Sequence, residues 1–330
     1  MSGPQYLRSL SLVVAGSNGS GIDLSNLRVR FHVQRGDTQT PNSCDARIYN
    51  ISRATATLIE NEFTQLVLQA GYGGDLNLVF RGVITQTRRG RIDQRDSYLD
   101  ITAADGDAAY NYSSMALTFA RGTQPQNDVQ AFVASFAKPA LGALPTVSLP
   151  VAQGYMAPLP PTSRVRGRVY FGLTRDCLRK FARTYDVKWS IQDGYLVLVK
   201  NGYYIPGEAV VISPSTGLIG VPEQTERGLS MRVLLNPNIK IGQLVQLQQS
   251  AINQVRLGLN SKQQAANILA KQQGLKLNSD GLYYVMRADH VGDTRGDEWY
   301  TDLTTLAVDA SVPQSAIAGS AIGPTPVYRY

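Results

Sequence analysis

The sequence predicts a mainly β protein in which two small antiparallel β-barrels flank an α+β insert. Apolar and polar residues alternate with the period of a β-strand in two blocks, at about 6–104 and 207–308. Between the blocks lie two helical patterns followed by a hairpin. Helices do not alternate with the strands in either block, which argues against a parallel α/β sheet and favours closed or nearly closed antiparallel sheets.

Composition sets the limits of this prediction. The chain has 330 residues, 43% of them apolar and 17% charged, which is typical of two or three folded domains. Its two cysteines, Cys44 and Cys177, lie far apart in the sequence and predict neither a zinc site nor a disulfide framework. Apolar runs are too short for a signal peptide or a membrane span, so we expect no export by that route and no membrane association.

The N-terminal block, 1–111, is predicted to form the first barrel. Ser52 is expected to cap a short amphipathic helix at 53–63. Gly73 and Gly74 supply the positive φ angles of a tight hairpin turn. The strands expected in this block are 6–14, 27–34, 45–51, 65–72, 76–87 and 97–104.

The middle block, 112–206, is predicted to be a separate α+β domain. Asn127 is expected to cap a first helix that ends at Pro139, and Thr174 to cap a second one that ends near 185. A Pro-rich segment at 139–163 is expected to lack regular structure.

The clearest hairpin of the sequence closes the middle block. It spans 187–200, and Asp193-Gly194 is expected to form a type I′ turn. Trp189 and Leu198 are predicted core residues of this hairpin.

The C-terminal block, 207–310, is predicted to form the second barrel from strands at 209–212, 228–235, 243–248, 283–290 and 299–308. A Gln- and Asn-rich insertion at 249–279 interrupts it. The insertion forms either a polar helix at about 263–273 or a protruding loop. Residues 311–330 are expected to be a flexible or partner-dependent tail.

The formal charge of +7 and the pI of about 9.3 raise the question of nucleic-acid binding. Tyr170, Phe171 and Phe181 are expected in the core and not as base-stacking platforms. We therefore favour a basic surface that meets an acidic partner over nucleic-acid binding. The basic residues form two clusters, Arg81, Arg88, Arg89, Arg91 and Arg95 in the first block and Arg164, Arg166, Arg168, Arg175, Arg179, Lys180 and Arg183 in the second.

Residues with catalytic or metal-binding potential are few. His32 and His290 are the only histidines, and both are predicted to be structural residues in strands. Asp289, Asp293, Asp297 and Glu298 are acidic enough to suggest calcium, but their spacing is not that of an EF-hand loop. No catalytic, cofactor-binding or metal-binding residue is assigned.

An enzyme is the alternative class. A peptidoglycan-degrading enzyme would need two carboxylates facing each other across a cleft, and a sequence alone does not show whether two carboxylates are so placed. The residues available for such a pair are Glu60, Glu62, Glu223, Glu226 and Glu298.

Three stretches resemble one protein family. Residues 41–84 contain PNSCDARIYNIS, a short predicted helix and a hairpin that ends in FRGVI. They resemble the first domain of baseplate hub proteins of contractile-tailed bacteriophages. Residues 216–247 and 281–303 resemble the two signature segments of the C-terminal domain in that family.

The resemblance implies a structural virion protein, not an enzyme, and no cofactor. Its two barrels would be tube-like, and three copies would form a pseudo-sixfold ring that joins the sixfold tail tube to the threefold central spike. The implied partners are the tail tube protein, the spike, and in addition tape-measure and other baseplate proteins. The genome would pass through the central channel without specific binding. The protein would be made in the cytoplasm of the bacterial host and reside in the tail baseplate.

Overall fold

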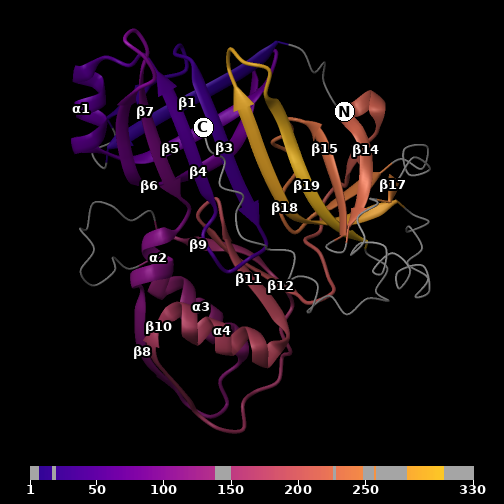
Figure 1. Ribbon diagram of the computed structural model, residues 1–330. Coiled ribbons are helices and arrows are strands. Elements are labelled where there is room, and N and C mark those ends of the chain that lie inside the picture. The colour runs from indigo at the N-terminus through magenta and orange to yellow at the C-terminus, as the bar shows by residue number, and fades with distance from the viewer. Residues whose placement is uncertain are drawn as a thin grey trace.

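The computed structural model is mainly β, as the sequence predicts, with its α-helices concentrated in the middle of the chain (Figure 1). The structure describes residues 7–16, 20–137, 150–225, 228–247, 256–257 and 281–307. Helices α2, α3 and α4 lie with strands β8–β12 below the large sheet in the view of Figure 1.

The N-terminal elements follow the alternation of the sequence. In β3, Val29, Phe31 and Val33 are buried while the residues between them are partly exposed. The Ser52 side chain accepts a hydrogen bond from the Thr55 amide, which confirms the predicted cap of α1. The elements are β1 (Arg8–Gly16), β2 (Gly21–Asp23), β3 (Val29–Gly36), β4 (Ser43–Tyr49), α1 (Arg53–Glu62), β5 (Phe63–Tyr72), β6 (Asp75–Arg91) and β7 (Ser97–Ala104).

The middle elements surround an apolar core of their own. Phe132, Phe181 and Trp189 are almost fully buried in it, and Trp189 lies opposite Leu198 in the hairpin, as predicted. No described helix is long and apolar enough to cross a membrane. The elements are α2 (Asp107–Tyr112), β8 (Ser114–Phe119), α3 (Pro125–Ala137), β9 (Ala152–Met156), β10 (Arg168–Leu173), α4 (Thr174–Tyr185), β11 (Val187–Gln192) and β12 (Tyr195–Lys200).

Three local predictions for this middle segment are wrong. Helix α3 begins at Pro125, so Asn127 lies inside its first turn, because proline is well suited to the first helical position. Leu173 and not Thr174 occupies the cap position of α4. The Pro-rich stretch contains strand β9, which pairs in parallel with β12, because its prolines at 158, 160 and 161 follow the strand and leave its amide groups free to bond.

A fourth prediction for this segment, that Phe171 belongs to the core, is also wrong. Phe171 of β10 is 83% exposed, whereas Tyr170 and Phe181 are buried, as predicted. Successive side chains of a strand point to opposite faces of the sheet, so Tyr170 faces the core and Phe171 faces solvent.

The C-terminal elements are β13 (Val210–Ile212), the 3-10 turn η1 (Pro214–Thr216), β14 (Leu218–Thr225), β15 (Gly228–Leu234), β16 (Leu244–Leu247), β17 (Arg256–Leu257), β18 (Leu282–Asp293) and β19 (Trp299–Ala307). Of the predicted insertion at 249–279, the structure describes only β17, which pairs with β14. The predicted tail at 311–330 lies outside the described residues.

One hydrogen-bonded sheet contains strands from both ends of the chain. Its order is β17-β14-β15-β19-β18-β3-β4-β7-β6-β5-β1-β2. Outside this order, β16 pairs with β18, and β13 pairs with β16. Strand β18 pairs with β3 from Arg287 opposite Gly36 to Asp293 opposite Arg30. The strands that the sequence analysis assigned to two separate barrels are therefore joined edge to edge.

The N-terminal core also contains residues from the C-terminal half. Trp299 and Leu235 are buried among the side chains of β1, β3 and β5. The rings of Trp299 and Phe31 pack edge to face, with their centroids 5.7 Å apart. The two strand sets thus share apolar packing as well as a hydrogen-bonded ladder.

Candidate functional site at the junction of three chain segments

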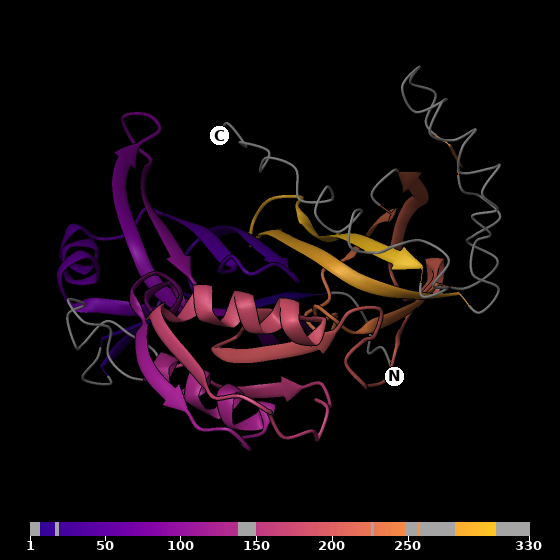
Figure 2. The same cartoon turned by 90° about the horizontal axis from the view of Figure 1, so that it is seen from below.

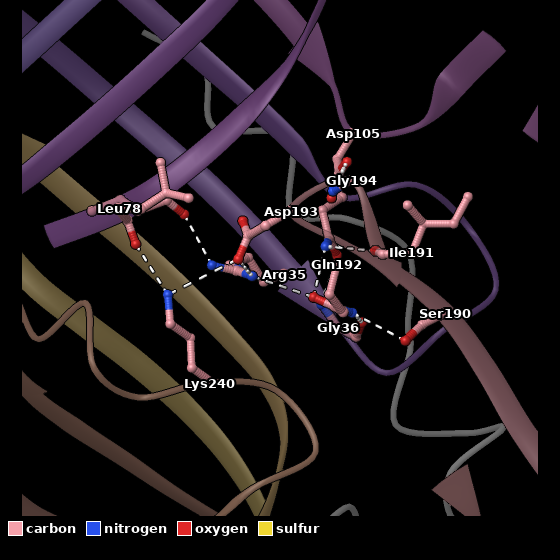
Figure 3. Close-up of polar contacts among 12 residues, drawn as sticks. Arg35, Gly36, Leu78, Asp105, Ser190, Ile191, Gln192, Asp193, Gly194 and Lys240 are labelled. Carbon is pink, nitrogen blue, oxygen red and sulfur yellow. Dashed lines mark hydrogen bonds and ion pairs between the residues drawn. The ribbon is translucent and has the colours of Figure 1, made fainter. Parts of the chain in front are cut away.

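The turn between β11 and β12 is the place where the N-terminal strands, the middle segment and the C-terminal segment meet (Figure 3). Asp193 and Gly194 have φ angles of 55° and 83°, which confirms the predicted turn with two left-handed residues. We call this turn, together with Arg35, Asp105 and Lys240, the junction.

Arg35 of β3 provides the central contact of the junction. Its side chain is 3% exposed, and its guanidinium donates to Asp193 Oδ2 at 2.7 Å and to the Val79 carbonyl at 3.1 Å. Burying a guanidinium is costly unless a counter-ion and further acceptors are present. Asp193 and the Val79 carbonyl supply both, so the ion pair fixes the hairpin turn to β3 and β6.

Lys240, between β15 and β16, brings the C-terminal segment to the same carboxylate. Its Nζ donates to the Leu78 carbonyl at 3.1 Å and lies 4.0 Å from Asp193 Oδ2. Burial, and secondarily the positive charge of Arg35, lowers the pKa of Lys240. Asp193 therefore sits between two cations that come from opposite halves of the chain.

Asp105, just after β7, holds the other side of the turn. Its Oδ1 accepts a hydrogen bond of 2.9 Å from the Gly194 amide. Burial, followed by the nearby charge of Asp193, raises the pKa of Asp105 to about 7. The junction thus contains one carboxyl group that titrates near neutral pH.

Amide side chains complete the attachment of the hairpin. Asn42 Nδ2 donates to the Ile191 carbonyl at 3.2 Å and to Gln192 Oε1 at 2.9 Å. Gln192 Nε2 donates in turn to the Gly36 carbonyl at 2.8 Å. These bonds give the turn a single orientation on the sheet, because the amide groups of Asn42 and Gln192 each have specific partners.

A second polar contact lies next to the junction. Lys188 of β11 forms an ion pair of 3.2 Å with Asp37, and the Tyr284 hydroxyl of β18 donates to the same carboxylate at 3.1 Å. Residues of all three segments again share one carboxylate.

Three of the four acidic residues considered for calcium contact arginines of the N-terminal strand set, whereas the fourth, Asp289, pairs with Arg287 of its own strand β18 at 2.7 Å. Asp293 accepts two hydrogen bonds from the Arg28 guanidinium, at 3.2 and 2.7 Å, and Glu298 pairs with Arg30 at 2.8 Å. The backbone carbonyl of Asp297 accepts a hydrogen bond from Arg8 at 3.1 Å. Within the described residues no group of acidic, histidine or cysteine side chains could hold a metal ion.

Both histidines lie in strands, His32 in β3 and His290 in β18, as predicted. His290 is 1% exposed, and its Nδ1 lies 2.9 Å from Thr301 Oγ1. Burial lowers the pKa of His290 to about 3, so the ring is neutral under ordinary conditions. Burial also lowers the pKa of His32.

The glutamates considered for catalysis are dispersed. Glu60 pairs with Arg89 at 2.5 Å and Glu298 pairs with Arg30, whereas Glu62 and Glu223 are exposed on α1 and β14. Glu226 lies outside the described residues. The structure therefore brings none of the four described glutamates together in a facing pair.

A groove of about 440 Å³ lies over β4, β7 and β6 and contains two aspartates. Asp45 accepts a hydrogen bond from Thr102 at 2.7 Å, and Asp100 accepts two from Arg47, at 2.7 and 2.9 Å. Both carboxylates are engaged by neighbours across the sheet, which is typical of structural contacts.

The fold belongs to a class found in phage tails. The chain is similar to the 43 kDa tail protein of prophage MuSo2 from Shewanella oneidensis, with 10% identity, a TM-score of 0.54, and coverage of 92% of this chain and 99% of that one. It is also similar to a tail protein from Neisseria meningitidis MC58, with 11% identity, a TM-score of 0.51, and coverage of 91% and 96%.

A chain of the Francisella PdpA–VgrG complex shows 7% identity and a TM-score of 0.50, with coverage of 90% of this chain and 58% of that one. No curated protein sequence matches the chain. Residues 164–259 match the family model described as baseplate hub gp41, a stretch that includes the β11–β12 turn and Lys240. The match confirms the resemblance to baseplate hub proteins that the sequence predicts.

Sequence reasoning found the Asp193-Gly194 turn but missed its partners. Arg35, Asp105 and Lys240 lie in separate strands and loops, and no local pattern relates them to the hairpin. One signal was available. Ionisable residues lie in or beside the predicted buried strands, and a charged side chain is seldom buried without a partner.

Proposed function

We propose that this chain is a structural subunit of a phage tail baseplate hub, and that three copies form a pseudo-sixfold ring between the sixfold tail tube and the threefold central spike. The observation that carries the proposal is the β18–β3 ladder, which places two strand sets of one chain side by side in a single sheet. A trimer would then present six strand sets on the tube side and three identical chains on the spike side.

The junction supports this role because a ring of fixed geometry needs each chain to be internally rigid. Arg35, Asp193 and Lys240 tie the three proposed domains, 1–111, 112–206 and 207–310, to one another. These contacts would hold the three domains in fixed positions, and the proposed role needs no enzymatic activity, cofactor or metal.

The ends of the sheet offer surfaces for neighbouring copies. Strand β2 lies at one end of the order and β17 at the other. In the described residues, β14 pairs with β17 only at Glu223 and Gln224, and Ile219 and Val221 on β14 are 39% and 37% exposed. Open strand edges are sites where another strand adds, so edge-to-edge pairing would close the ring.

The proposed partners are further copies of this chain, the tail tube protein and the central spike, with tape-measure and other baseplate proteins nearby. The genome would pass through the ring without specific binding. The proposed location is the virion tail baseplate, after synthesis in the cytoplasm of the bacterial host.

Cryo-electron microscopy of the assembled tail tests the proposal. We expect three copies of the chain per baseplate, with both strand sets in one ring. Six copies, or three copies with only one strand set in the ring, would overturn it. Ile219→Lys should reduce incorporation into the ring, and Ile92→Lys, at an exposed site in the β6–β7 turn, is the matched control.

A further inference from the structure

The middle segment is attached to the large sheet mainly through polar contacts. Its buried core contains only residues from 109–198. Among the described residues, no helix or strand of this segment packs extensively against an element of the sheet. Val197 and Val199 of β12 face away from that core and border a cavity of about 10 Å³, which Ile241 and Tyr284 line from the C-terminal side. A sparse and polar interface of this kind allows two parts of a chain to move relative to each other.

Two short connections join the middle segment to the sheet. The first is Asp105-Gly106, between β7 and α2, and Gly106 has a φ angle of 71°. The second is 202–204. Before it, the Asn201 amide donates to a carbonyl of the middle segment at 3.0 Å, and after it the Ile205 amide donates to a carbonyl of the C-terminal segment at 2.7 Å. Short connections between anchored bodies are the places where hinge motions occur.

Asp105 lies at the first connection and also holds the β11–β12 turn (Figure 3). It is 3% exposed, and its Oδ1 accepts a hydrogen bond from the Gly194 amide. Its Oδ2 is buried without a hydrogen-bond partner among the described residues. An ionised carboxylate is unfavourable in such a position, because burial removes water and nothing replaces it at Oδ2. The docked conformation therefore favours the protonated form of Asp105.

The charges beside Asp105 act in both directions. Burial is the main cause that raises the pKa of Asp105 to about 7, and the Asp193 carboxylate adds to it, whereas Arg35 opposes it. The charged and titratable side chains of the junction and of the elements beside it are Asp193 in the turn, Arg35 of β3, Lys240 between β15 and β16, Asp107 of α2 and His290 of β18.

We propose that Asp105 is a pH-sensitive catch for the middle segment: loss of its proton weakens the hold of the sheet on the β11–β12 turn, and the segment then swings away as one body about 105–106 and 202–204. The contacts of Arg35, Asn42 and Gln192 remain when Asp105 is charged, so the opening is transient. Because the catch acts within one chain, it is independent of the proposed function.

Opening should become more favourable as pH rises. In the open conformation Asp105 is exposed to water, where the ordinary pKa of its carboxyl group is 3.8. Between about pH 4 and pH 7 the closed conformation therefore binds more protons than the open one. The equilibrium constant for opening should increase about thirtyfold between pH 5.5 and pH 8.0.

Hydrogen–deuterium exchange of the isolated full-length chain tests the catch, with each rate divided by the intrinsic rate at the same pH. We expect protection of the Gly194 amide to fall about thirtyfold from pH 5.5 to pH 8.0, while the β4–β7 ladder keeps its protection. Asp105→Asn keeps an acceptor for this amide and carries no charge, so its turn should show no such fall. Constant protection of the turn in the wild type, an equal fall in the variant, or a parallel loss in the ladder would overturn the proposal.

Thiol labelling of Val199→Cys distinguishes a swing of the whole segment from fraying of the turn. Val199 is 6% exposed and lies near the end of β12 that is remote from the turn. Its labelling rate, relative to that of the unfolded chain at the same pH, should rise about thirtyfold from pH 5.5 to pH 8.0, and the rise should be absent when Asp105→Asn is added. The buried native thiols of Cys177 and Cys44 are internal controls for the middle and N-terminal cores. Protection of Val199→Cys that does not change with pH, or a parallel loss at Cys177, would show fraying or unfolding instead of a hinge.

Discussion

Arg35 and Asp193 lie 158 positions apart in the sequence, and the guanidinium of Arg35 donates to the Asp193 carboxylate at 2.7 Å. The Arg35 side chain is 3% exposed and that of Asp193 is 18% exposed. Strand β3, which carries Arg35, also pairs with β18 of the C-terminal half. One strand therefore holds both the middle segment and the second strand set. Figure 3 shows its contact with the middle segment, and Figure 2 shows the helices of that segment in front of the sheet when the molecule is seen from below.

Replacing Arg35 with methionine should destabilise the protein by about 3–5 kcal/mol, because it leaves Asp193 partly buried without its closest cation. Urea denaturation followed by tryptophan fluorescence measures the change. Arg88→Met, at an exposed position of β6, is the control and should change stability by less than about 0.5 kcal/mol. Equal stabilities of the two variants would show that the ion pair makes no net contribution.

Replacing Gly194 with valine should destabilise the protein by roughly 1–3 kcal/mol. The φ angle of Gly194 is 83°, which a β-branched residue adopts only with strain, and no atom lies within 4 Å of the added Cβ. The cost therefore comes from the backbone and not from a clash. Thermal unfolding measures it, with Gly207→Ala as the control at a glycine outside the left-handed region. A melting temperature equal to that of the wild type would contradict the turn assignment.

The Asp105 carboxyl should make the protein less stable as pH rises. Its pKa is about 7 in the folded state against an ordinary value of 3.8, so between these values the folded protein binds more protons than the unfolded chain. Stability contributed by the protonated form is therefore lost between about pH 4 and pH 7. Asp105→Asn keeps an acceptor for the Gly194 amide and should gain roughly 1–3 kcal/mol relative to the wild type between pH 4.5 and pH 8. Parallel pH profiles of the two proteins would refute this.

His290 should make the protein more stable as pH rises, the opposite of the effect of Asp105. Its pKa is about 3 in the folded state against an ordinary value of 6.5, so the unfolded chain binds more protons between these values. Stability should fall as pH decreases below about 6.5, by at most ~1.4 kcal/mol per pH unit. His290→Asn retains a group that can bond Thr301 and should remove this dependence. Denaturation of the variant from pH 4 to pH 8 checks the prediction, which fails if its acid sensitivity equals that of the wild type.

Limited proteolysis tests the proposed boundaries of the middle segment. The Pro-rich stretch predicts first cuts between 141 and 161, and the pairing of β9 with β12 should protect Ala152–Met156 within it. We expect slow cleavage in 45–104, where the strands form continuous ladders. Mass spectrometry of early fragments identifies the sites. First cuts within the hairpin at 65–84 would contradict the proposed N-terminal domain.

The sequence by itself determined most of the local structure. Alternation predicted strands such as β3 and β7, and the Asp-Gly pair predicted the turn at 193–194, because strand period and turn chemistry depend on neighbouring residues. The helix caps were less accurate. Asn127 and Thr174 both have good capping side chains, but Pro125 and the end of β10 at Leu173 set the two helix starts.

Only the tertiary structure decided which residues meet. The pairing of β18 with β3 merges the two predicted strand blocks, and it brings the acidic segment around Asp293 to Arg28. The junction of Arg35, Asp193 and Lys240, and the exposure of Phe171, likewise depend on how separate elements dock. Such contacts join residues far apart in the chain, and their geometry follows from the packing of whole strands, which no local sequence pattern records.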